Sequence, residues 1–222
     1  MSVVAIDGPA AAGKGTLARR LAKHFGLAYL DTGKLYRATA LHVIEAGDDP
    51  ADPAAARRAA LAVRPDELAN PRLLDEDVAR ASSVVAAEPG VRQALLAFQR
   101  GFAAAPPEGT RGAVLDGRDI GTVVCPDAAV KLYVTASAET RAARRVKELR
   151  DRGVESIEAA VLQDLLVRDQ RDASRLSAPS KPAEDAIVLD TTHLDADAAF
   201  AIAADLVGRK LRPWSAEGPS RD

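Results

Sequence analysis

The feature that most constrains the fold is a glycine-rich segment near the N-terminus, "AIDGPAAAGKGTLARRL" at Ala5–Leu21. A short apolar, β-branched run precedes its glycines and an amphipathic pattern over about 14–25 follows them. The sequence therefore predicts a strand, a tight turn and a helix. In such a turn the backbone N–H groups converge at the positive end of the helix dipole and bind anions. The spacing of Gly8, Gly13 and Lys14 is typical of a phosphate-binding loop.

The residue after the lysine departs from the usual form of this loop. A Ser or Thr normally follows the lysine and binds Mg²⁺, whereas here Gly15 follows and the hydroxyl comes one place later, at Thr16. We therefore expect phosphates and water, rather than protein ligands, to hold the metal. The alternative is a glycine turn beside a surface lysine in an alanine-rich chain. If the loop binds ATP, the residues in contact with it are Gly8, Pro9, Ala10, Ala11, Ala12, Gly13, Lys14, Gly15 and Thr16.

Strand and helix patterns alternate along the chain. Apolar runs predict core strands at 2–6, 27–31, 112–117, 130–136 and 186–192. Helical patterns lie at about 14–25, 32–46, 77–87, 90–104, 155–176 and 195–211, with another from Ser137, while 48–76 shows weak strand signals. This alternation predicts an α/β fold with a doubly wound, parallel sheet of about five strands. Ligands bind at the carboxyl ends of the strands in such sheets.

The composition argues against several other classes of protein. The chain has 222 residues, enough for one α/β domain with a small insertion, and no run of about 18 apolar residues that would span a membrane. Its net charge of −2 provides no field that would attract nucleic acid. The single cysteine, Cys125, rules out an internal disulfide framework and, with only three histidines, argues against a structural zinc site. We expect a cytoplasmic monomer.

A second candidate segment is "YLDTGKLYRA", which follows the second predicted strand. Thr32 stands at the predicted start of a helix, with Tyr36 and Arg37 one turn further on. A hydroxyl, a helix dipole and a guanidinium could hold a phosphate there. The alternative is a Thr32 that caps the helix beside a solvated Arg37, and the segment taken alone favours this alternative.

A third segment, "VLDGRDIGTVVCPDA", is more specific. Arg118 and Asp119 follow an apolar strand and lie between glycines, where charged side chains suit a ligand better than they suit folding. Arg118 could bind a phosphate, and Asp119 could accept hydrogen bonds from an exocyclic amine or a ribose hydroxyl. The alternative is a local salt bridge in a turn.

The segment "RDQRDASR" places Arg168, Arg171, Asp172 and Arg175 on one face of a helix, at positions i, i+3, i+4 and i+7. Three guanidiniums on one stripe repel each other unless an anion joins them. The ordinary interpretation is a solvated face with Asp169 and Asp172 as partners. Beside a phosphate loop, the pattern favours a lid whose arginines neutralise charge on a transferring phosphoryl group.

The segment "TRAARR" places Arg141, Arg144 and Arg145 on one face of another predicted helix. One of these guanidiniums could stack on an adenine base. A basic surface helix is the alternative.

Together these segments resemble the bacterial cytidylate kinases over nearly the whole chain, and the order G-K-G-T is typical of nucleoside monophosphate kinases. "IDGPAAAGKGT", "LDTGKLYR", "DGRDIGTVVCPDA", "RDQRDASR" and "KPAEDAIVLDTT" occur in that family's order and spacing. The resemblance implies a Mg²⁺-dependent transfer of a phosphoryl group from ATP to CMP or dCMP. These small molecules are then the partners, with neither nucleic acid nor membrane involved.

The resemblance also implies roles for individual residues. "SVVAAEPGVRQALL" matches the family's SxVAxxPxVRxxLL pattern, which implies that Ser83 and Arg92 read the cytosine edge together with Asp119. The expected CMP-binding residues are Thr32, Tyr36, Arg37, Ser83, Arg92, Arg118, Asp119, Asp172 and Arg175. The expected ATP-binding residues outside the loop are Arg141 and Arg145, and the expected catalytic residues are Lys14, Arg168, Arg171 and Arg175.

The family's organisation implies a P-loop kinase core, an acceptor-binding insertion and a helical lid. The expected ranges are about 1–31, 110–150 and 184–211 for the core, 32–109 for the acceptor region, 155–182 for the lid and 212–222 for a disordered tail. One departure is visible: "VRPDELANPRLLDEDVARAS" is shorter than the family's insertion, which usually holds a short β-hairpin.

Two other functions compete with this interpretation. The first is a kinase for another small acceptor, such as shikimate, a sugar acid or UMP. The second is a nucleotide-dependent switch without transferase activity, although the N-K-x-D motif that reads guanine is absent.

Overall fold

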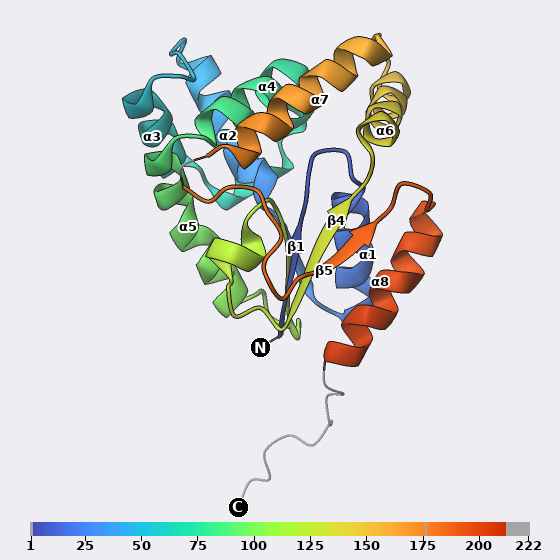
Figure 1. The fold of residues 1–222 in the computed structure, drawn as a ribbon. Helices are drawn as coiled ribbons and strands as arrows, with labels where there is room; N and C mark the ends of the chain where they lie inside the picture. The colour runs from blue at the N-terminus through green and yellow to red at the C-terminus, as the bar shows by residue number, and fades with distance from the viewer. Residues whose placement is uncertain (1, 176, 212–222) are drawn as a thin grey trace, which may run out of the picture.

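The computed structural model describes residues 2–175 and 177–211, and the tail expected at 212–222 lies outside this part of the chain. A parallel sheet of five strands forms the centre, in the order β2-β3-β1-β4-β5. The strands are β1 (Ser2–Asp7), β2 (Ala28–Asp31), β3 (Gly112–Asp116), β4 (Val130–Thr135) and β5 (Ile187–Asp190). The predicted fold class is confirmed, because the sheet is parallel and helices cover both of its faces (Figure 1).

Alternate residues of the strands pack into different layers. On β1, Val4 and Ile6 pack with the apolar face of α1 (Lys14–Phe25) and with α8 (Ala196–Lys210), while Ala5 belongs to a second cluster on the opposite face. Figure 1 shows α1 and α8 on one side of the sheet and α5 (Pro89–Ala104) on the other. Because both faces are covered, the strands are continuous apolar runs, as parallel strands generally are.

The region between β2 and β3 is helical and has a hydrophobic core of its own. It contains α2 (Thr32–Glu45), α3 (Pro53–Ala62), α4 (Glu76–Val85) and α5, with short 3-10 turns at Pro65–Ala69 and Pro71–Leu74. Leu35, Val78 and Val91 are among the residues of this separate core. The region is therefore a small helical layer attached to the sheet.

No strand forms over 48–76, where the strand signals were weak, but a helix that was not predicted from the sequence lies in this range. Asp52 accepts a hydrogen bond from the Ala54 backbone N–H and Pro53 occupies the first helical position, so the alanine-rich run that follows forms α3. None of the described residues between β2 and β3 forms a strand. The short insertion accordingly holds two 3-10 turns in place of a hairpin.

Two helices lie between β4 and β5, and the second falls within the range expected for the lid. α6 (Ala138–Asp151) follows β4, and α7 (Glu158–Ala173) returns along the top of the molecule beside α4 (Figure 1). Ser137 caps α6 by accepting a hydrogen bond from the Thr140 backbone N–H. Within the described ranges, no helix is long and apolar enough to span a bilayer.

Candidate nucleotide-binding site

The glycine-rich segment forms a tight loop between β1 and α1. A Cβ at Gly8 would lie 1.9 Å from the carbonyl oxygen of Val134, and φ at this residue is +142°, so only glycine fits. Gly13 stands at the N-cap of α1 in the left-handed conformation. The turn, the helix N-terminus and the lysine come together as the spacing predicts.

Lys14 is neither a loop residue nor a surface side chain. α1 begins at Lys14, its side chain is buried, and Nζ donates a hydrogen bond of 2.7 Å to the Pro9 carbonyl oxygen. Burial and the nearby charge of Arg118 lower the pKa of Lys14 to about 7. A phosphate placed against Nζ would relieve this unfavourable environment.

Gly15 is the place where a buried carboxylate approaches the loop. A Cβ at Gly15 would lie 3.3 Å from Oδ2 of Asp116, the last residue of β3. Asp116 is buried and its pKa is raised to about 6 by burial, against the opposite charge of Lys14. Sequence reasoning missed Asp116, although an aspartate at a strand end before Gly117 is a signal that could have found it.

The described residues include no group of three or more His, Cys, Asp or Glu side chains that could hold a metal ion. Asp116 is the carboxylate that approaches closest to the position of Gly15. A single carboxylate at this position is able to accept hydrogen bonds from water bound to a metal ion. The donor set fits Mg²⁺ in that manner, since this ion usually keeps several of its waters.

Arg141 connects the phosphate loop to the lid. Its guanidinium is buried, donates a hydrogen bond of 3.4 Å to the Ala10 carbonyl oxygen and pairs at 2.7 Å with Asp169 on α7. The Arg141 guanidinium therefore lies beside the loop, and its role in binding ATP stays a prediction.

The other two arginines of α6 diverge from Arg141, although all three were predicted to share one face. Arg144 donates to the side-chain and backbone oxygens of Thr191, at 3.0 and 2.6 Å. Arg145 pairs with Glu76 on α4 and, at 2.8 Å, with Glu148. The three arginines are therefore close together along α6, but their guanidiniums contact different parts of the molecule.

The acceptor side contains a buried ion pair between Arg92 and Asp119. The Arg92 guanidinium also lies over the ring of Tyr36, with its carbon 5.5 Å from the ring centroid. These groups come from α5, the turn after β3, and α2, which are remote in sequence. The alternative of a salt bridge local to the turn is wrong, because the partner of Asp119 is 27 residues away.

The alternatives for Thr32 and Arg37, a helix cap and a solvated side chain, are both wrong. Thr32 does not cap α2: it is the first residue of that helix, after Asp31, and its Oγ1 donates at 2.7 Å to the Asp116 carbonyl oxygen. Arg37 is half-buried and not solvated, since it donates at 2.6 Å to the Leu73 carbonyl oxygen. Burial and the charge of Arg145 lower the pKa of Arg37.

Four side chains of the predicted lid stripe converge on the acceptor side. Asp172 is buried, accepts a hydrogen bond of 3.1 Å from Arg118 Nε and pairs with Arg175. Although burial opposes the effect, Arg118 and Arg175 hold the pKa of Asp172 below its usual value. Arg171 donates at 2.9 Å to the Ser83 hydroxyl on α4. The solvated-face alternative is wrong for Asp172.

The Arg168 guanidinium is buried close to another positive charge, that of Arg118. Its Nε is buried and has no hydrogen-bond partner in the part of the chain that the structure describes. Burial and the charge of Arg118 lower its pKa to about 9. The Nε of Arg175 is in the same condition. Unpaired buried donors beside like charges are satisfied if an anion binds between them.

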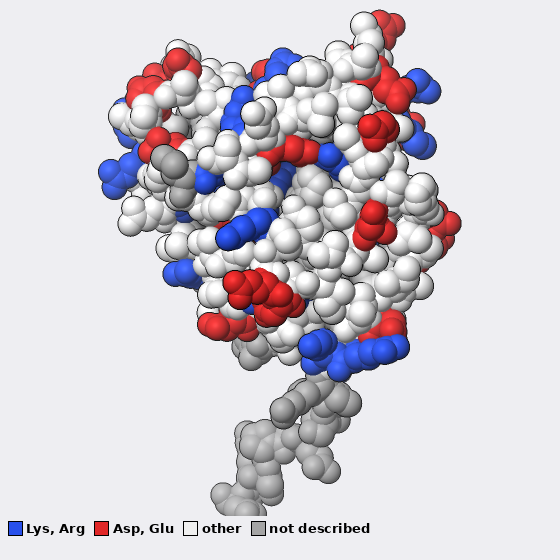
Figure 2. Space-filling model, in the orientation of Figure 1, with Lys and Arg blue, Asp and Glu red and all other residues white. Residues whose placement is uncertain are grey.

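A small cavity of about 50 Å³ lies among these groups. A cavity needs about 10–15 Å³ to hold one water molecule, so this one is too small for a nucleotide unless its walls separate. On the face shown in Figure 2, Lys and Arg side chains are interleaved with acidic ones. The residues that line the small cavity are Thr32, Gly33, Tyr36, Ser82, Ser83, Ala86, Arg92, Gly117, Arg118, Asp119, Arg168, Asp172 and Arg175.

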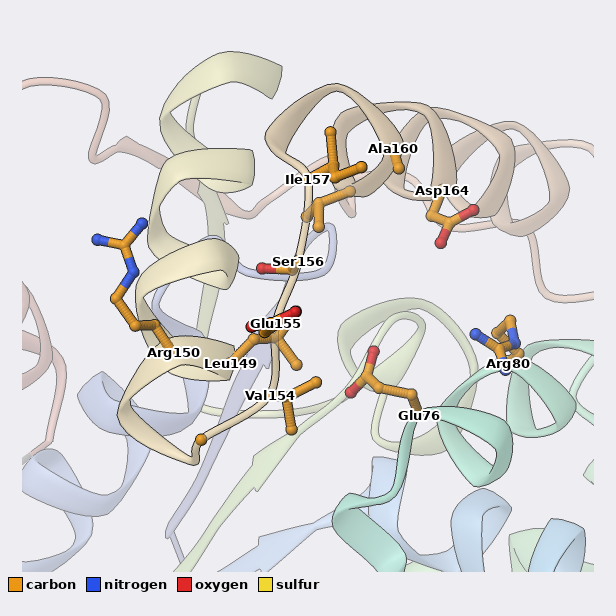
Figure 3. Close-up of a pocket in the computed structure, with 12 residues that line it drawn as sticks. Glu76, Arg80, Leu149, Arg150, Val154, Glu155, Ser156, Ile157, Ala160 and Asp164 are labelled. Atoms are coloured by element: carbon orange, nitrogen blue, oxygen red, sulfur yellow. The ribbon is translucent and has the colours of Figure 1, made fainter.

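A larger groove, of about 870 Å³, lies between α4 and the α6–α7 connection. Figure 3 shows Glu76 and Arg80 on the α4 side of it and Asp164 on α7. Its charged lining residues have both signs and the phosphate loop does not line it. We expect the acceptor nucleotide at the smaller cavity, because four arginine side chains line it, although the glycine loop does not.

The sequence matches known proteins over nearly its full length. A model of the family described as cytidylate kinase matches residues 4–208. A cytidylate kinase of Paramagnetospirillum magneticum is 60% identical over 209 residues, which are 94% of this chain and 99% of that protein. A cytidylate kinase of Granulibacter bethesdensis is 60% identical over 94% of this chain and 97% of its own length.

The fold has a counterpart among solved structures. An uncharacterized protein from Eubacterium ventriosum superposes with a TM-score of 0.50 and 16% identity, over 94% of this chain and 98% of that one. At this identity the likeness concerns the fold alone.

Proposed function

The chain belongs to the cytidylate kinase family, and on that premise we propose that its phosphate loop and acceptor cavity transfer the γ-phosphoryl group of ATP to CMP or dCMP. The products are ADP and CDP or dCDP. One observation carries the proposal: α7 contacts both sides of the site. Its Asp169 pairs with Arg141, which donates to the Ala10 carbonyl oxygen of the loop, and its Asp172 accepts a hydrogen bond from Arg118 of the acceptor turn. The loop, the acceptor turn and the lid are therefore close to one point, where a phosphoryl group could pass between two nucleotides.

On the donor side, the backbone N–H groups of the loop from Gly8 to Thr16 bind the β and γ phosphates of ATP, and Lys14 adds a charge. Arg141 supports this half from α6, where it already contacts the Ala10 carbonyl oxygen. Arg145 joins it once its pairing with Glu76 is released.

On the acceptor side, guanidiniums hold the phosphate of CMP and polar groups read its base. Arg37, Arg118 and Arg175 bind the phosphate, while Asp172 orients Arg118 and Arg175. The groups that read the cytosine edge are Ser83, Arg92 and Asp119, with the ring of Tyr36 beside Arg92.

The reaction needs no strong general base, because the CMP phosphate is already a nucleophile. Catalysis is positioning together with neutralisation of charge, supplied by Lys14, Arg168 and Arg171 from two sides, with Arg175 beside them. Mg²⁺, bound by phosphates and water, neutralises further charge on the phosphates. Asp116 would help to hold such an ion by accepting hydrogen bonds from its water, since this carboxylate approaches the position of Gly15.

Nucleotide entry requires the lid to open. Arg171 on α7 is bonded to Ser83 on α4, and Arg118 is bonded to Asp172, so both contacts must break to enlarge the cavity. Closure over the bound nucleotides excludes water and limits hydrolysis of ATP. The moving parts are the acceptor region at about 32–109 and the lid at about 155–182. The cytoplasmic location and the monomeric state stay predictions.

A coupled assay with CMP, dCMP, UMP and AMP tests the acceptor. We expect CMP or dCMP to give the highest kcat/KM. A clearly higher value for UMP or AMP would overturn the assignment of the base-reading residues. ATP binding without transfer to any of the four would instead favour a nucleotide-dependent switch.

A further inference from the structure

Asp7 has no role in the mechanism above, yet it lies between the two halves of the site. It ends β1 and directly precedes Gly8 of the phosphate loop. Its side chain is buried, and its two carboxylate oxygens accept hydrogen bonds from the backbone N–H groups of Ile120 and Gly121, each at 2.7 Å. These partners are 113 and 114 residues away along the chain.

The segment that Asp7 holds is the turn that carries the acceptor residues. Arg118 and Asp119 immediately precede Ile120, and Ile120–Val124 forms a single π-helical turn. The Asp119 carbonyl oxygen accepts from the Val123 and Val124 N–H groups. The first N–H groups of such a turn have no partner within it, so an outside acceptor must satisfy them. Asp7 supplies both acceptors at once.

The charged carboxylate of Asp7 is unfavourable in this buried position. Burial raises the pKa of Asp7 to about 6, against the hydrogen bonds from Gly121 and Ile120. Asp119 acts in the same direction as burial and Lys14 acts against it. A buried carboxylate destabilises the fold unless it is hydrogen-bonded, and both oxygens of Asp7 are bonded to this turn.

We propose that Asp7 is a positioning residue for the acceptor nucleotide: its carboxylate fixes the turn after β3, and through that turn the place of Arg118 and Asp119. The proposal rests on the proposed function, because it assigns these two residues to CMP. Asp7 itself does not line the acceptor cavity. Displacement of the turn would move Asp119 against Arg92 and so disturb the reading of the base, while the phosphate loop remains in place.

The test is the variant Asp7→Asn, which keeps the shape but turns one acceptor into a donor that faces an N–H group. We expect the dissociation constant for CMP to rise about 10-fold or more, and that for ATP to change by less than about 3-fold. The ratio of kcat/KM for CMP to that for UMP should also fall. Loss of a merely structural contact would lower Tm without changing this ratio.

A second variant disturbs the same turn from its other side. A Cβ at Gly121 would lie 3.1 Å from Cδ of Lys131 and 3.4 Å from Oδ2 of Asp7, so Gly121→Ala should give a smaller defect of the same CMP-selective kind. This variant keeps the test available if Asp7→Asn does not fold. Asp195→Asn is the control, since Asp195 also accepts two backbone N–H bonds but does so at the N-terminus of α8. We expect its CMP and ATP constants to equal those of the wild type.

The outcomes separate this proposal from the proposed function. If the wild-type protein phosphorylates CMP and both turn variants bind CMP normally, or if they lose ATP and CMP affinity equally, the positioning role is overturned. If the wild-type protein does not phosphorylate CMP or dCMP, the proposed function fails whatever the Asp7 variants do.

Discussion

The proposed donor half of the site consists mainly of backbone groups, whereas the proposed acceptor half consists of side chains. The donor half is one continuous segment whose backbone, with Gly8, Gly13 and Lys14, encloses the anion position. The acceptor half has no continuous binding segment, because its side chains come from α2, α4, α5, the turn after β3 and the lid. A backbone site depends on local geometry, whereas a side-chain site depends on how remote elements pack. Substitutions should therefore act locally in the first half and spread through ion pairs in the second.

The largest expected effect is on the donor half. Lys14→Ala should lower kcat/KM on the order of 1,000-fold, because it removes the charge that faces the transferring group. Tm at pH 7 should not fall, since a buried ammonium with a lowered pKa is unfavourable to the folded state. Steady-state kinetics and thermal unfolding measure both quantities.

Lys34→Ala is the matched control for this substitution. Lys34 also donates from Nζ to a backbone carbonyl oxygen, that of Leu68, but it lies on α2 away from the loop. Its kinetics should remain close to those of the wild type. A near-normal rate for Lys14→Ala would disprove the phosphate-loop assignment.

The second effect is on the acceptor half, and it should not stay local. Asp119→Ala should raise the KM for CMP about 100-fold and leave the KM for ATP within about 3-fold. It also leaves Arg92 buried without its partner, so we expect a lower Tm. Equal loss of both substrates would mean that Asp119 is structural.

A double variant separates the two consequences of this substitution. In Arg92→Met with Asp119→Ala the uncompensated charge is gone, so Tm should recover while CMP binding stays weak. Recovery of CMP binding together with Tm would contradict a direct role in reading the base.

The same contrast explains what could be predicted from the sequence. The strand, turn and helix around Lys14 were predictable, because each depends on neighbours in the chain. The burial of Lys14 and the approach of Asp116 to Gly15 were not, since they follow from the pairing of β1 with β3. Physics alone did not single out Ser83 or Arg92, which came from a resemblance, because nothing in their own segment says that Arg171 and Asp119 lie beside them.

A third expectation concerns pH and again separates the halves. Lys14 loses its proton as pH rises through about 7, and only the protonated form attracts phosphate, so ATP affinity should fall about 5-fold between pH 7 and pH 8. CMP affinity should not follow, because its phosphate meets guanidiniums; even Arg168, with a pKa lowered to about 9, keeps its proton in this range. Titration calorimetry at both pH values measures the two constants. A constant ATP affinity, or the same slope in Lys14→Ala, would contradict this account.

The smallest expected effect concerns a residue of the acceptor half that should influence ATP binding in the donor half. Arg145 is proposed to bind ATP, yet it is paired with Glu76 at the start of α4, and Arg152 lies 3.9 Å from the same carboxylate. Because Glu76 competes with ATP for Arg145, Glu76→Gln should lower the dissociation constant for ATP about 2-fold, as suits a partly exposed ion pair.

Glu148→Gln is the control for this last effect, because Glu148 pairs with Arg145 from within α6 and connects no other region. Glu148→Gln should change ATP binding less than Glu76→Gln does. Both Glu148 and Arg145 lie on α6, so their ion pair does not depend on whether the lid is open or closed. The decisive measurement is the double variant Glu76→Gln with Arg145→Met, in which the gain in ATP affinity should disappear. If the gain persists without Arg145, Glu76 does not restrain the donor half, and the two halves of the site bind their nucleotides independently.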